Sequence, residues 1–250
     1  MAAADALEAV VLRTIRYGEA DLIAHVHTRT GGVRGAIAKG ARRPKSRLGA
    51  RLEPFLVVRL QLIEGRGDLA TVRGVEVIAA HEQLRSSWRA QQAGAAAFEL
   101  VRRLSVEHEP NEPMHHLVRN FLDVLDAAAG DPATEEVRAA TTLAAFELKL
   151  LHVAGIAPQL AACVRCGDRT AVVGYAAQDG GVTCVSCRVP TDTHLDERTH
   201  VAAVELMRAP MVAALSRPVA DLPDLRTLRS IGVDLVRPTC VAHAGFGAGS

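Results

Sequence analysis

The chain of 250 residues lacks the short motifs by which many enzyme families are recognised. It contains no G-x-x-x-x-G-K-[ST], so we expect no P-loop ATPase, and no H-E-x-x-H or G-x-S-x-G of common hydrolases. A zinc deaminase would carry H-x-E ahead of its cysteines, and no H-x-E occurs here. With no catalytic constellation in the chain, a binding protein is favoured over an enzyme.

Long apolar runs and secretion signals are also missing. No segment approaches the roughly 18 apolar residues of a membrane span. The N-terminus carries Asp5 and Glu8, where a secretory signal would carry bases. We therefore expect a cytoplasmic protein without a membrane partner. Thiols stay reduced in that compartment, so the five cysteines are interpreted as metal ligands or core residues before disulfides.

Aromatic residues are scarce, at 3% of the chain. Barrels that hold single-stranded nucleic acid usually add aromatic stacking to charge. The strand-like N-terminal part offers only Tyr17 and Phe55 for that purpose. If this part binds nucleic acid, we expect contacts mainly to phosphates, with little sequence preference.

Basic residues are in excess in the N-terminal part of the chain, and one stretch of that part contains no acidic residue. Residues 1–80 carry 13 Lys and Arg against 8 Asp and Glu, a net +5, and the remainder carries 16 against 20, a net −4. Residues 39–51 hold no acid and six bases: Lys39, Arg42, Arg43, Lys45, Arg47 and Arg51. Glycine, proline and serine interrupt the run, which predicts a flexible loop suited to a phosphate backbone. The alternative is a solvated basic loop without a ligand.

Five strand-like segments surround this loop. They cover residues 9–15, 22–28, 33–38, 55–63 and 69–78, with turn signals at 31–32 and 65–68. The count fits a five-stranded oligonucleotide-binding (OB) barrel, and an SH3-like barrel fits almost as well. Residues 65–70 also match G-x-G-x-x-A, but a strand pattern follows them, so we interpret them as a hairpin and not a dinucleotide site.

Helical periodicity begins at Leu84. Three apolar stripes predict a packed helical core. The first is Leu84, Trp88, Ala95, Phe98, Val101 and Leu104. Asp131 is expected to cap the third helix, with Pro132 in its first turn. Further helices are expected from 199 and over 225–236.

The predicted architecture is α+β with several domains: an OB domain (1–80), a helical domain (81–160 and 192–237), a zinc-binding insertion with four cysteines (161–191) and a flexible tail (238–250).

Four cysteines form C-x₂-C-x₁₇-C-x₂-C, namely Cys163, Cys166, Cys184 and Cys187. Each pair presents two thiolates on a tight turn, and two such knuckles complete a tetrahedral shell around one ion. The spacing predicts one structural Zn²⁺, because four thiolates leave no open position for catalysis. A thioredoxin-type redox pair lacks a βαβ context and needs no second C-x₂-C. Cys240 stands alone and is assigned no role.

Several segments, taken in order, resemble the RecO recombination mediators, a bacterial family of DNA repair proteins. They are residues 17–22 (YGEADL), 38–47 (AKGARRPKSR), 52–55 (LEPF), 65–69 (GRGDL), 146–151 (FELKLL), 155–158 (GIAP) and the four cysteines. The run of basic residues within 38–47 is the most specific of them. The likeness extends from about residue 7 to 190.

The resemblance implies an OB barrel, a mostly helical domain and a zinc knuckle. It also implies a nucleoid-associated protein that binds single- and double-stranded DNA, anneals complementary strands and has no catalytic residues. Its expected partners are RecR and single-strand-binding protein, and through them RecA is loaded onto DNA. We predict DNA contacts from the six loop bases together with Arg34 and Arg66.

Two other interpretations stay open at this point. The chain could be a protein–protein adaptor, whose basic loop meets acidic protein tails without touching DNA. It could also be an RNA- or ribosome-associated zinc protein.

Overall fold

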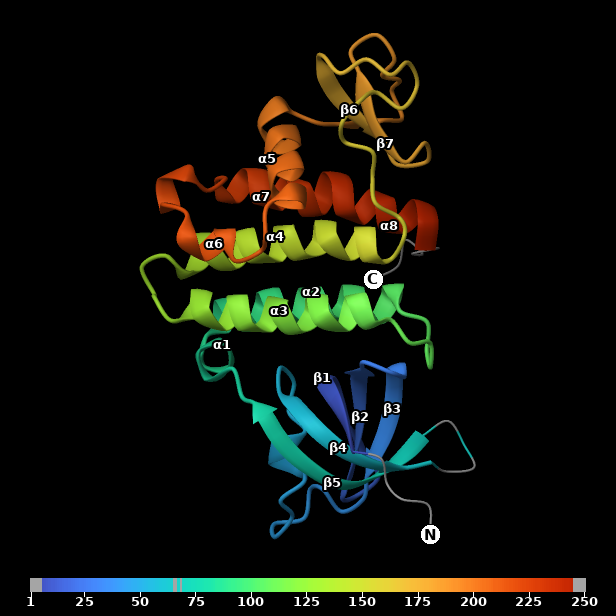
Figure 1. The fold of residues 1–250 in the computed structure, drawn as a ribbon, viewed down its shortest axis with the longest axis vertical. Coiled ribbons are helices and arrows are strands. Elements are labelled where there is room, and N and C mark those ends of the chain that lie inside the picture. The colour runs from blue at the N-terminus through green and yellow to red at the C-terminus, as the bar shows by residue number, and fades with distance from the viewer. Residues whose placement is uncertain (1–5, 65–66, 68, 245–250) are drawn as a thin grey trace.

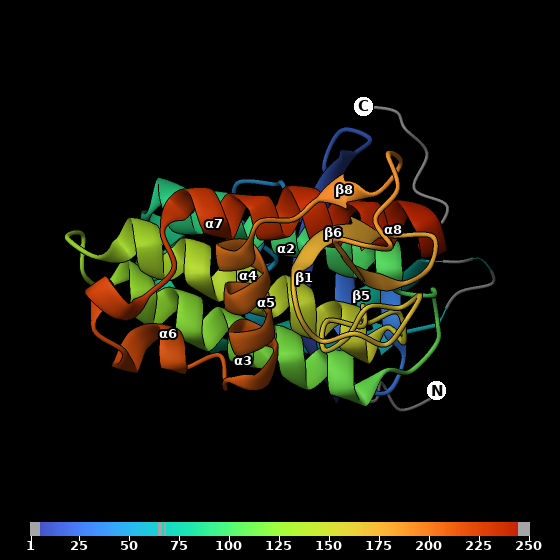
Figure 2. The same ribbon diagram turned by 90° about the horizontal axis from the view of Figure 1, so that it is seen from above.

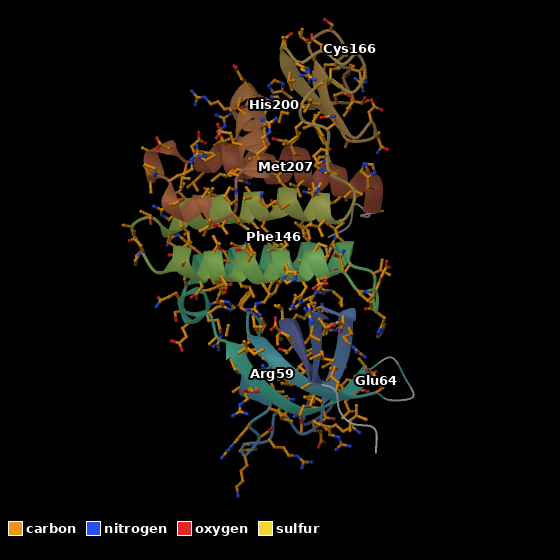
Figure 3. All side chains as sticks on the ribbon, in the orientation of Figure 1. Arg59, Glu64, Phe146, Cys166, His200 and Met207 are labelled. Atoms are coloured by element: carbon orange, nitrogen blue, oxygen red, sulfur yellow. The ribbon has the colours of Figure 1, made fainter. Side chains whose placement is uncertain are left out.

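Three parts follow one another along the longest axis of the molecule (Figure 1). The computed structural model describes residues 6–64, 67 and 69–244. A β-barrel occupies one end, layers of helices form the middle, and a small sheet that carries the cysteines lies at the other end (Figures 1 and 3). No helix within these described ranges combines the length and apolar character of a membrane span.

The barrel is closed by five strands: β1 (Ala6–Tyr17), β2 (Asp21–Thr28), β3 (Gly32–Ala38), β4 (Val57–Ile63) and β5 (Leu69–Ala79). Their order is β1-β2-β3-β5-β4, and β3 pairs with β5 in parallel. All other neighbours are antiparallel. An SH3-like barrel has antiparallel neighbours throughout, so the parallel pair decides for the OB-type barrel. The predicted fold class is confirmed.

Alternation along the strands fills the barrel. Ala24 and Val26 of β2 point inward with Ala36 of β3, and all three are fully buried. Leu52 and Leu56, which precede β4, close the same core. Because successive side chains of a strand face opposite sides, Ile23 and His25 lie on the outer surface.

Helices build the middle of the molecule. They are α1 (Glu82–Ser86), α2 (Trp88–Leu104), α3 (Glu112–Ala129), α4 (Glu135–Val153), α5 (Glu197–Arg208), α6 (Ala213–Ser216), α7 (Leu225–Ser230) and α8 (Arg237–Ala244), with a π-helical turn at Ile231–Val236 between α7 and α8. Short 3₁₀ turns lie at Gly49–Arg51 and Val219–Asp221. Phe121 of α3 and Phe146 of α4 pack with ring centroids 4.3 Å apart, at the centre of the helical core (Figure 3).

The packing role expected for Trp88 is wrong. Its side chain is 71% exposed, and Ala95 on the same expected stripe is exposed too. The cause is a break at Ser87, which has extended backbone and accepts a hydrogen bond from the amide of Ala90 as N-cap of α2. Leu84 therefore belongs to the separate helix α1. Phe98 and Val101 of the expected stripe are buried in the core, whereas Trp88 and Ala95 lie on the exposed face of α2.

Two further expectations need correction. The tail expected from residue 238 is helical in its first part, because α8 extends to Ala244 and buries Cys240; residues 245–250 lie outside the described range. Helix α4 begins at Glu135 rather than after Asp131. The Asp131 carboxylate instead accepts hydrogen bonds from the Ala133 amide and the Thr134 hydroxyl, which closes a turn ahead of the helix.

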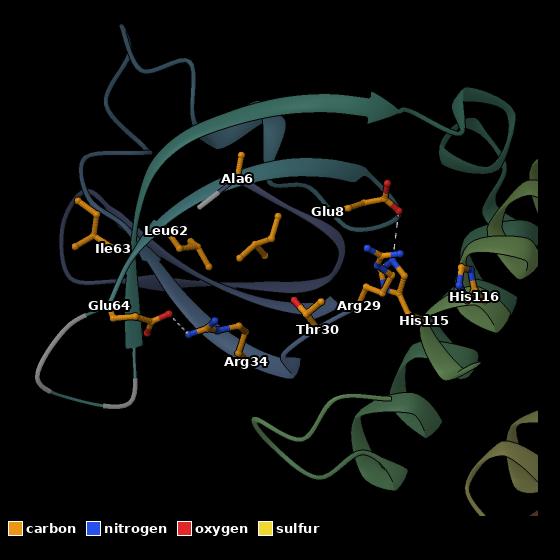
Figure 4. A pocket seen from close by; sticks show the side chains of 11 residues that line it. Ala6, Glu8, Arg29, Thr30, Arg34, Leu62, Ile63, Glu64, His115 and His116 are labelled. Carbon is orange, nitrogen blue, oxygen red and sulfur yellow. Dashed lines mark hydrogen bonds and ion pairs between the residues drawn. The ribbon is translucent and has the colours of Figure 1, made fainter. Parts of the chain in front are cut away.

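Charged and titratable side chains join the barrel to α3. Glu8 of β1 pairs with Arg119 and accepts from Nε2 of His115 at 3.3 Å. Nδ1 of His115 faces Nδ1 of His27 at 3.3 Å, and both imidazoles are buried. Figure 4 shows Glu8 and His115 meeting beside the hollow between barrel and helices. This cluster fixes how the barrel sits on the helical body.

The cysteines lie on and around a three-stranded sheet of order β7-β6-β8: β6 (Val172–Ala176), β7 (Gly181–Cys184) and β8 (Thr193–His194). Tyr175 of β6 is fully buried, and its hydroxyl lies 2.5 Å from Oγ1 of Thr239 in α8. One side chain thus ties the cysteine-bearing sheet to the last helix.

Candidate nucleic-acid interface and metal centre

The basic loop starts at the barrel end that faces away from the helices. Strand β3 begins at Gly32, which packs against the backbone of Glu109, and runs from the helical body toward Ala38. Lys39 follows directly. The turn between β1 and β2 lies at the same end, since Tyr17 pairs with Asp21 and Leu22 pairs with Ala38.

Backbone hydrogen bonds give the loop a defined course, in place of the flexible one expected. The Arg42 amide donates to the carbonyl of Ala20 in the β1–β2 turn, and the Gly40 amide donates to the Asp21 carboxylate at 2.7 Å. Ala41 and Leu48 pack into the barrel core. The loop is therefore anchored by its apolar residues, which leaves its charged residues on the outside.

All six bases of the loop are exposed: Lys39, Arg42, Arg43, Lys45, Arg47 and Arg51. Within the described residues none of them forms an ion pair with a carboxylate. Two donate to backbone carbonyls, Arg42 to Glu19 and Arg51 to Val75, each at 3.1 Å. Such bonds orient a guanidinium without neutralising it, so the loop forms an open cationic face.

The remaining two predicted DNA contacts are placed differently. Arg34 lies on β3, has a side chain only 13% exposed, and pairs with Glu64 at 2.6 Å. Figure 4 shows this pair at the hollow between barrel and helices. Its charge is compensated there and does not add to the loop. Arg66 lies outside the described residues.

The four knuckle cysteines converge at the opposite end of the molecule, where Figure 3 labels Cys166. The sulfur atoms of Cys163, Cys166, Cys184 and Cys187 all lie within 4.8 Å of one another. Those of Cys166 and Cys184 are 3.7 Å apart. Four sulfurs bound to one ion at about 2.3 Å would be separated by about 3.8 Å in a tetrahedron. The cluster therefore has the size and donor set to hold one thiophilic metal ion.

Backbone amides prepare the first thiol for that role. Burial opposes ionisation of Cys163, but the amides of Cys184, Arg165 and Cys166 donate to its sulfur, and together they lower its pKa below the usual range. A metal binds the thiolate form, so these bonds favour loading.

Two residues that sequence reasoning missed hold the knuckles together. The side chain of Asp192 is only 3% exposed, and its carboxylate accepts hydrogen bonds from both terminal nitrogens of Arg165, at 2.7 and 2.9 Å. Arg165 also donates to Asp179 and to the carbonyl of Cys187. The hydroxyl of Thr183 and the amide of Val189 also donate to Asp192. Arg165 lies between two cysteines, but its partner is 27 positions away, which no local pattern indicates.

Comparisons with known proteins agree with this architecture. Residues 3–81 match the family model for the recombination protein O N terminal region, and residues 85–231 match the model for its C terminal region. The chain is 35% identical to the DNA repair protein RecO of Rubrobacter xylanophilus over 239 residues, which is 94% of this chain and 90% of that protein.

Two more relatives carry the same name. The RecO of Anaeromyxobacter sp. strain K is 35% identical over 219 residues, which cover 86% of this chain and 83% of that protein. The RecO of Cutibacterium acnes is 37% identical over 195 residues, 77% of each chain. With an OB-type barrel, a helical body and matches that span most of its length, this chain belongs to the RecO family of DNA repair proteins.

Proposed function

We propose that this chain is a non-enzymatic recombination mediator that binds single- and double-stranded DNA and promotes annealing of complementary strands. The observation that carries the proposal is the open cationic loop on the OB barrel, whose six bases are exposed and unpaired with carboxylates among the described residues. Charge at such density supports phosphate contacts without sequence preference. It also screens the repulsion between two strands, as annealing requires.

Membership in the RecO family supports a proposal for the partners of this chain. We propose that it acts with RecR and single-strand-binding protein, and that RecA is the recombinase loaded onto the DNA. Its place of action is then the nucleoid, within the cytoplasm. One Zn²⁺ is the ion proposed for the four cysteines, because zinc favours tetrahedral thiolate shells. The ion would be structural, since four protein ligands leave no position for a substrate.

The test is the affinity of the full chain for a fluorescent single-stranded oligonucleotide as a function of salt. If the six loop bases contact phosphates, log K falls with log[salt] with a slope of about −4, from about −0.7 per contact. Reversing Arg42, Arg43 and Lys45 to Glu is expected to abolish binding at moderate salt. These side chains are exposed, so the variant should keep the fold.

A matched control reverses three exposed arginines of the helical part, Arg208, Arg229 and Arg237. It makes the same change in net charge far from the barrel, and near-normal affinity is expected. Equal loss in both variants would mean that only total charge matters, and unchanged affinity in the loop variant would remove the loop as the DNA site. An adaptor without DNA contact would not bind the bare oligonucleotide at all, and competition by RNA of equal length tests the RNA alternative.

A further inference from the structure

A groove of about 500 Å³ runs between the barrel and α2. Leu12, Arg13 and Phe55 line it from the barrel side, and Trp88, Phe98 and Arg102 line it from α2. From Trp88 to Arg102 the helix advances 14 residues, about 21 Å at 1.5 Å per residue. The groove is therefore long enough for an extended chain, with an apolar floor and cationic side chains toward one end.

Trp88 stands at the other end of this groove. Its 71% exposure is the largest among the exposed large apolar side chains of the described residues. It is the first residue of α2 and contributes nothing to the helical core. An indole left in water beside an apolar floor is a surface on which a flat ring can stack.

Arg13 supplies a second and independent observation. Its Nε is buried and has no hydrogen-bond partner, and no ion pair of Arg13 occurs within the described residues. Glu99 lies close enough to Arg13 for their charges to attract, but its carboxylate accepts hydrogen bonds from Arg102 and Arg103 instead. The groove lining thus carries two cations, Arg13 and Arg102, against one carboxylate. A ligand that carries hydrogen-bond acceptors and negative charge would complement this excess of cations.

Exposed apolar side chains continue from the end of the groove along the outer face of the barrel. Beyond Arg13, alternate residues of β1 place Ile15 and Tyr17 outward, at 39% and 53% exposure. Tyr17 adjoins the β1–β2 turn, where the carbonyl of Glu19 accepts from Arg42 of the basic loop. Figure 2 shows the β1–β2 hairpin projecting on the side of α2, away from α3 and α6. Groove, strand and loop thus share one side of the molecule.

We propose that this groove is a second contact for single-stranded DNA, in which an unpaired base stacks on Trp88 and Arg13 binds acceptors of the same strand. The proposal rests on the proposed function, because the strand is the one whose phosphates meet the basic loop. Alternating rings and phosphates match the order of features found here: an exposed indole, a cation with an unsatisfied donor, and an exposed tyrosine. Duplex DNA keeps its bases stacked internally, so the groove acts on single strands only.

Trp88 is the one tryptophan of the chain, so intrinsic fluorescence reports on the groove directly. An unlabelled oligothymidine is expected to quench the fluorescence of the full chain and to protect the indole from iodide. Binding of the same strand is followed in parallel by anisotropy of a labelled copy. Trp88→Ala is expected to weaken single-strand affinity about tenfold, from the energy of one base stack. Duplex affinity should be unchanged.

Val185→Ala serves as a matched control, because Val185 is 65% exposed but lies in the second cysteine knuckle. Arg13→Gln should reduce single-strand affinity in the same direction as Trp88→Ala. If anisotropy shows binding while Trp88 fluorescence and the Trp88→Ala affinity stay unchanged, the groove is overturned and the proposed function stands. No anisotropy change with any DNA would overturn both. Quenching by an acidic, aromatic peptide but not by oligothymidine would assign the groove to a protein partner and overturn the proposal.

Discussion

At the scale of single residues, the cysteine cluster depends on a carboxylate that is not one of its four candidate ligands. Asp192 is buried and is held ionised chiefly by Arg165, whose hydrogen bonds lower the pKa of the carboxyl to about 2. Both knuckles depend on this pair, because Arg165 belongs to the first and donates to the carbonyl of Cys187 in the second. Orientation of ligands by their neighbours is a general property of metal sites.

Replacing Asp192 with Asn removes the charge while keeping the shape. Hydrogen bonds to charged groups contribute about 1.5–3 kcal/mol each to stability, so we expect the free energy of unfolding to fall by that order. We also expect the metal affinity to be lower by about 10–100-fold. Competition with a chromophoric chelator measures the affinity. Asp179→Asn is the control, since Asp179 is more exposed and meets Arg165 from the outside. Equal metal affinity in the Asp192 variant and the natural protein would contradict the supporting role.

The positions of some functional residues could be predicted from the sequence, whereas the partners of others could not. The four cysteines converge as their spacing predicts, because a C-x₂-C turn constrains two thiols by itself. The partnership of Arg165 with Asp192 depends instead on how the chain returns after β7. Similarly, the six loop bases are exposed as expected, but the compensation of Arg34 by Glu64 arises from two strands that meet only in the barrel.

At the scale of elements, the contact of α2 with the barrel requires a glycine. A Cβ on Gly94 would lie 2.6 Å from the ring of Phe55. The ring cannot retreat easily, because it packs against Phe98 with centroids 5.2 Å apart, and Phe55 itself has a φ of 71°. Glycine in a helix costs about 1 kcal/mol relative to alanine, and here the close packing offsets that cost.

Gly94→Ala is therefore expected to destabilise the protein by about 1–3 kcal/mol through overpacking, although alanine is the better helix former. Urea unfolding measures the change. Gly130→Ala is the control, because Gly130 has an ordinary φ of −72° and a Cβ there would lie 3.4 Å from the nearest carbonyl oxygen. Its stability should change by about 0.5 kcal/mol or less. A stabilised Gly94 variant would show that the barrel can shift on α2 without cost.

Helix phase is what the sequence predicts least well at this scale. The apolar spacing from Leu84 to Leu104 fits a single helix, yet Ser87 ends one helix and caps the next. A serine followed by tryptophan looks the same in a continuous helix, so only the tertiary position of α1 against α3 decides. By contrast, the strand segments are predicted closely, because two-residue alternation restarts correctly after every turn.

At the scale of the whole molecule, barrel and helices meet across two histidines that favour the neutral state. Burial, followed by the nearby His115, lowers the pKa of His27 to about 4. Burial also lowers the pKa of His115, although the contact with Glu8 opposes the shift. The two Nδ1 atoms face each other, so at most one can donate and the pair cannot hold two protons there.

Stability should therefore depend on pH. In the unfolded chain His27 takes up a proton near pH 6.5, but in the folded chain it does so only near pH 4. The contribution of neutral His27 is fully present above pH 6.5 and is lost as the pH falls toward 4, by about 3 kcal/mol in total. Urea unfolding at steps between pH 7.5 and 4.5 measures the loss. His27→Gln should flatten this pH dependence. If the stability of the variant fell as steeply with pH as that of the natural protein, groups other than His27 would be responsible.

The positions of the two ends have a consequence for the binding of more than one partner. The cysteine cluster and the basic loop lie at opposite extremes of the longest axis, with the full thickness of the helical layers between them (Figure 1). A short strand bound at the basic loop, as proposed, would leave the cysteine-bearing tip uncovered. A second partner could then bind the tip while the strand stays at the barrel. Because the two ends are far apart, the two partners would not compete for the same surface.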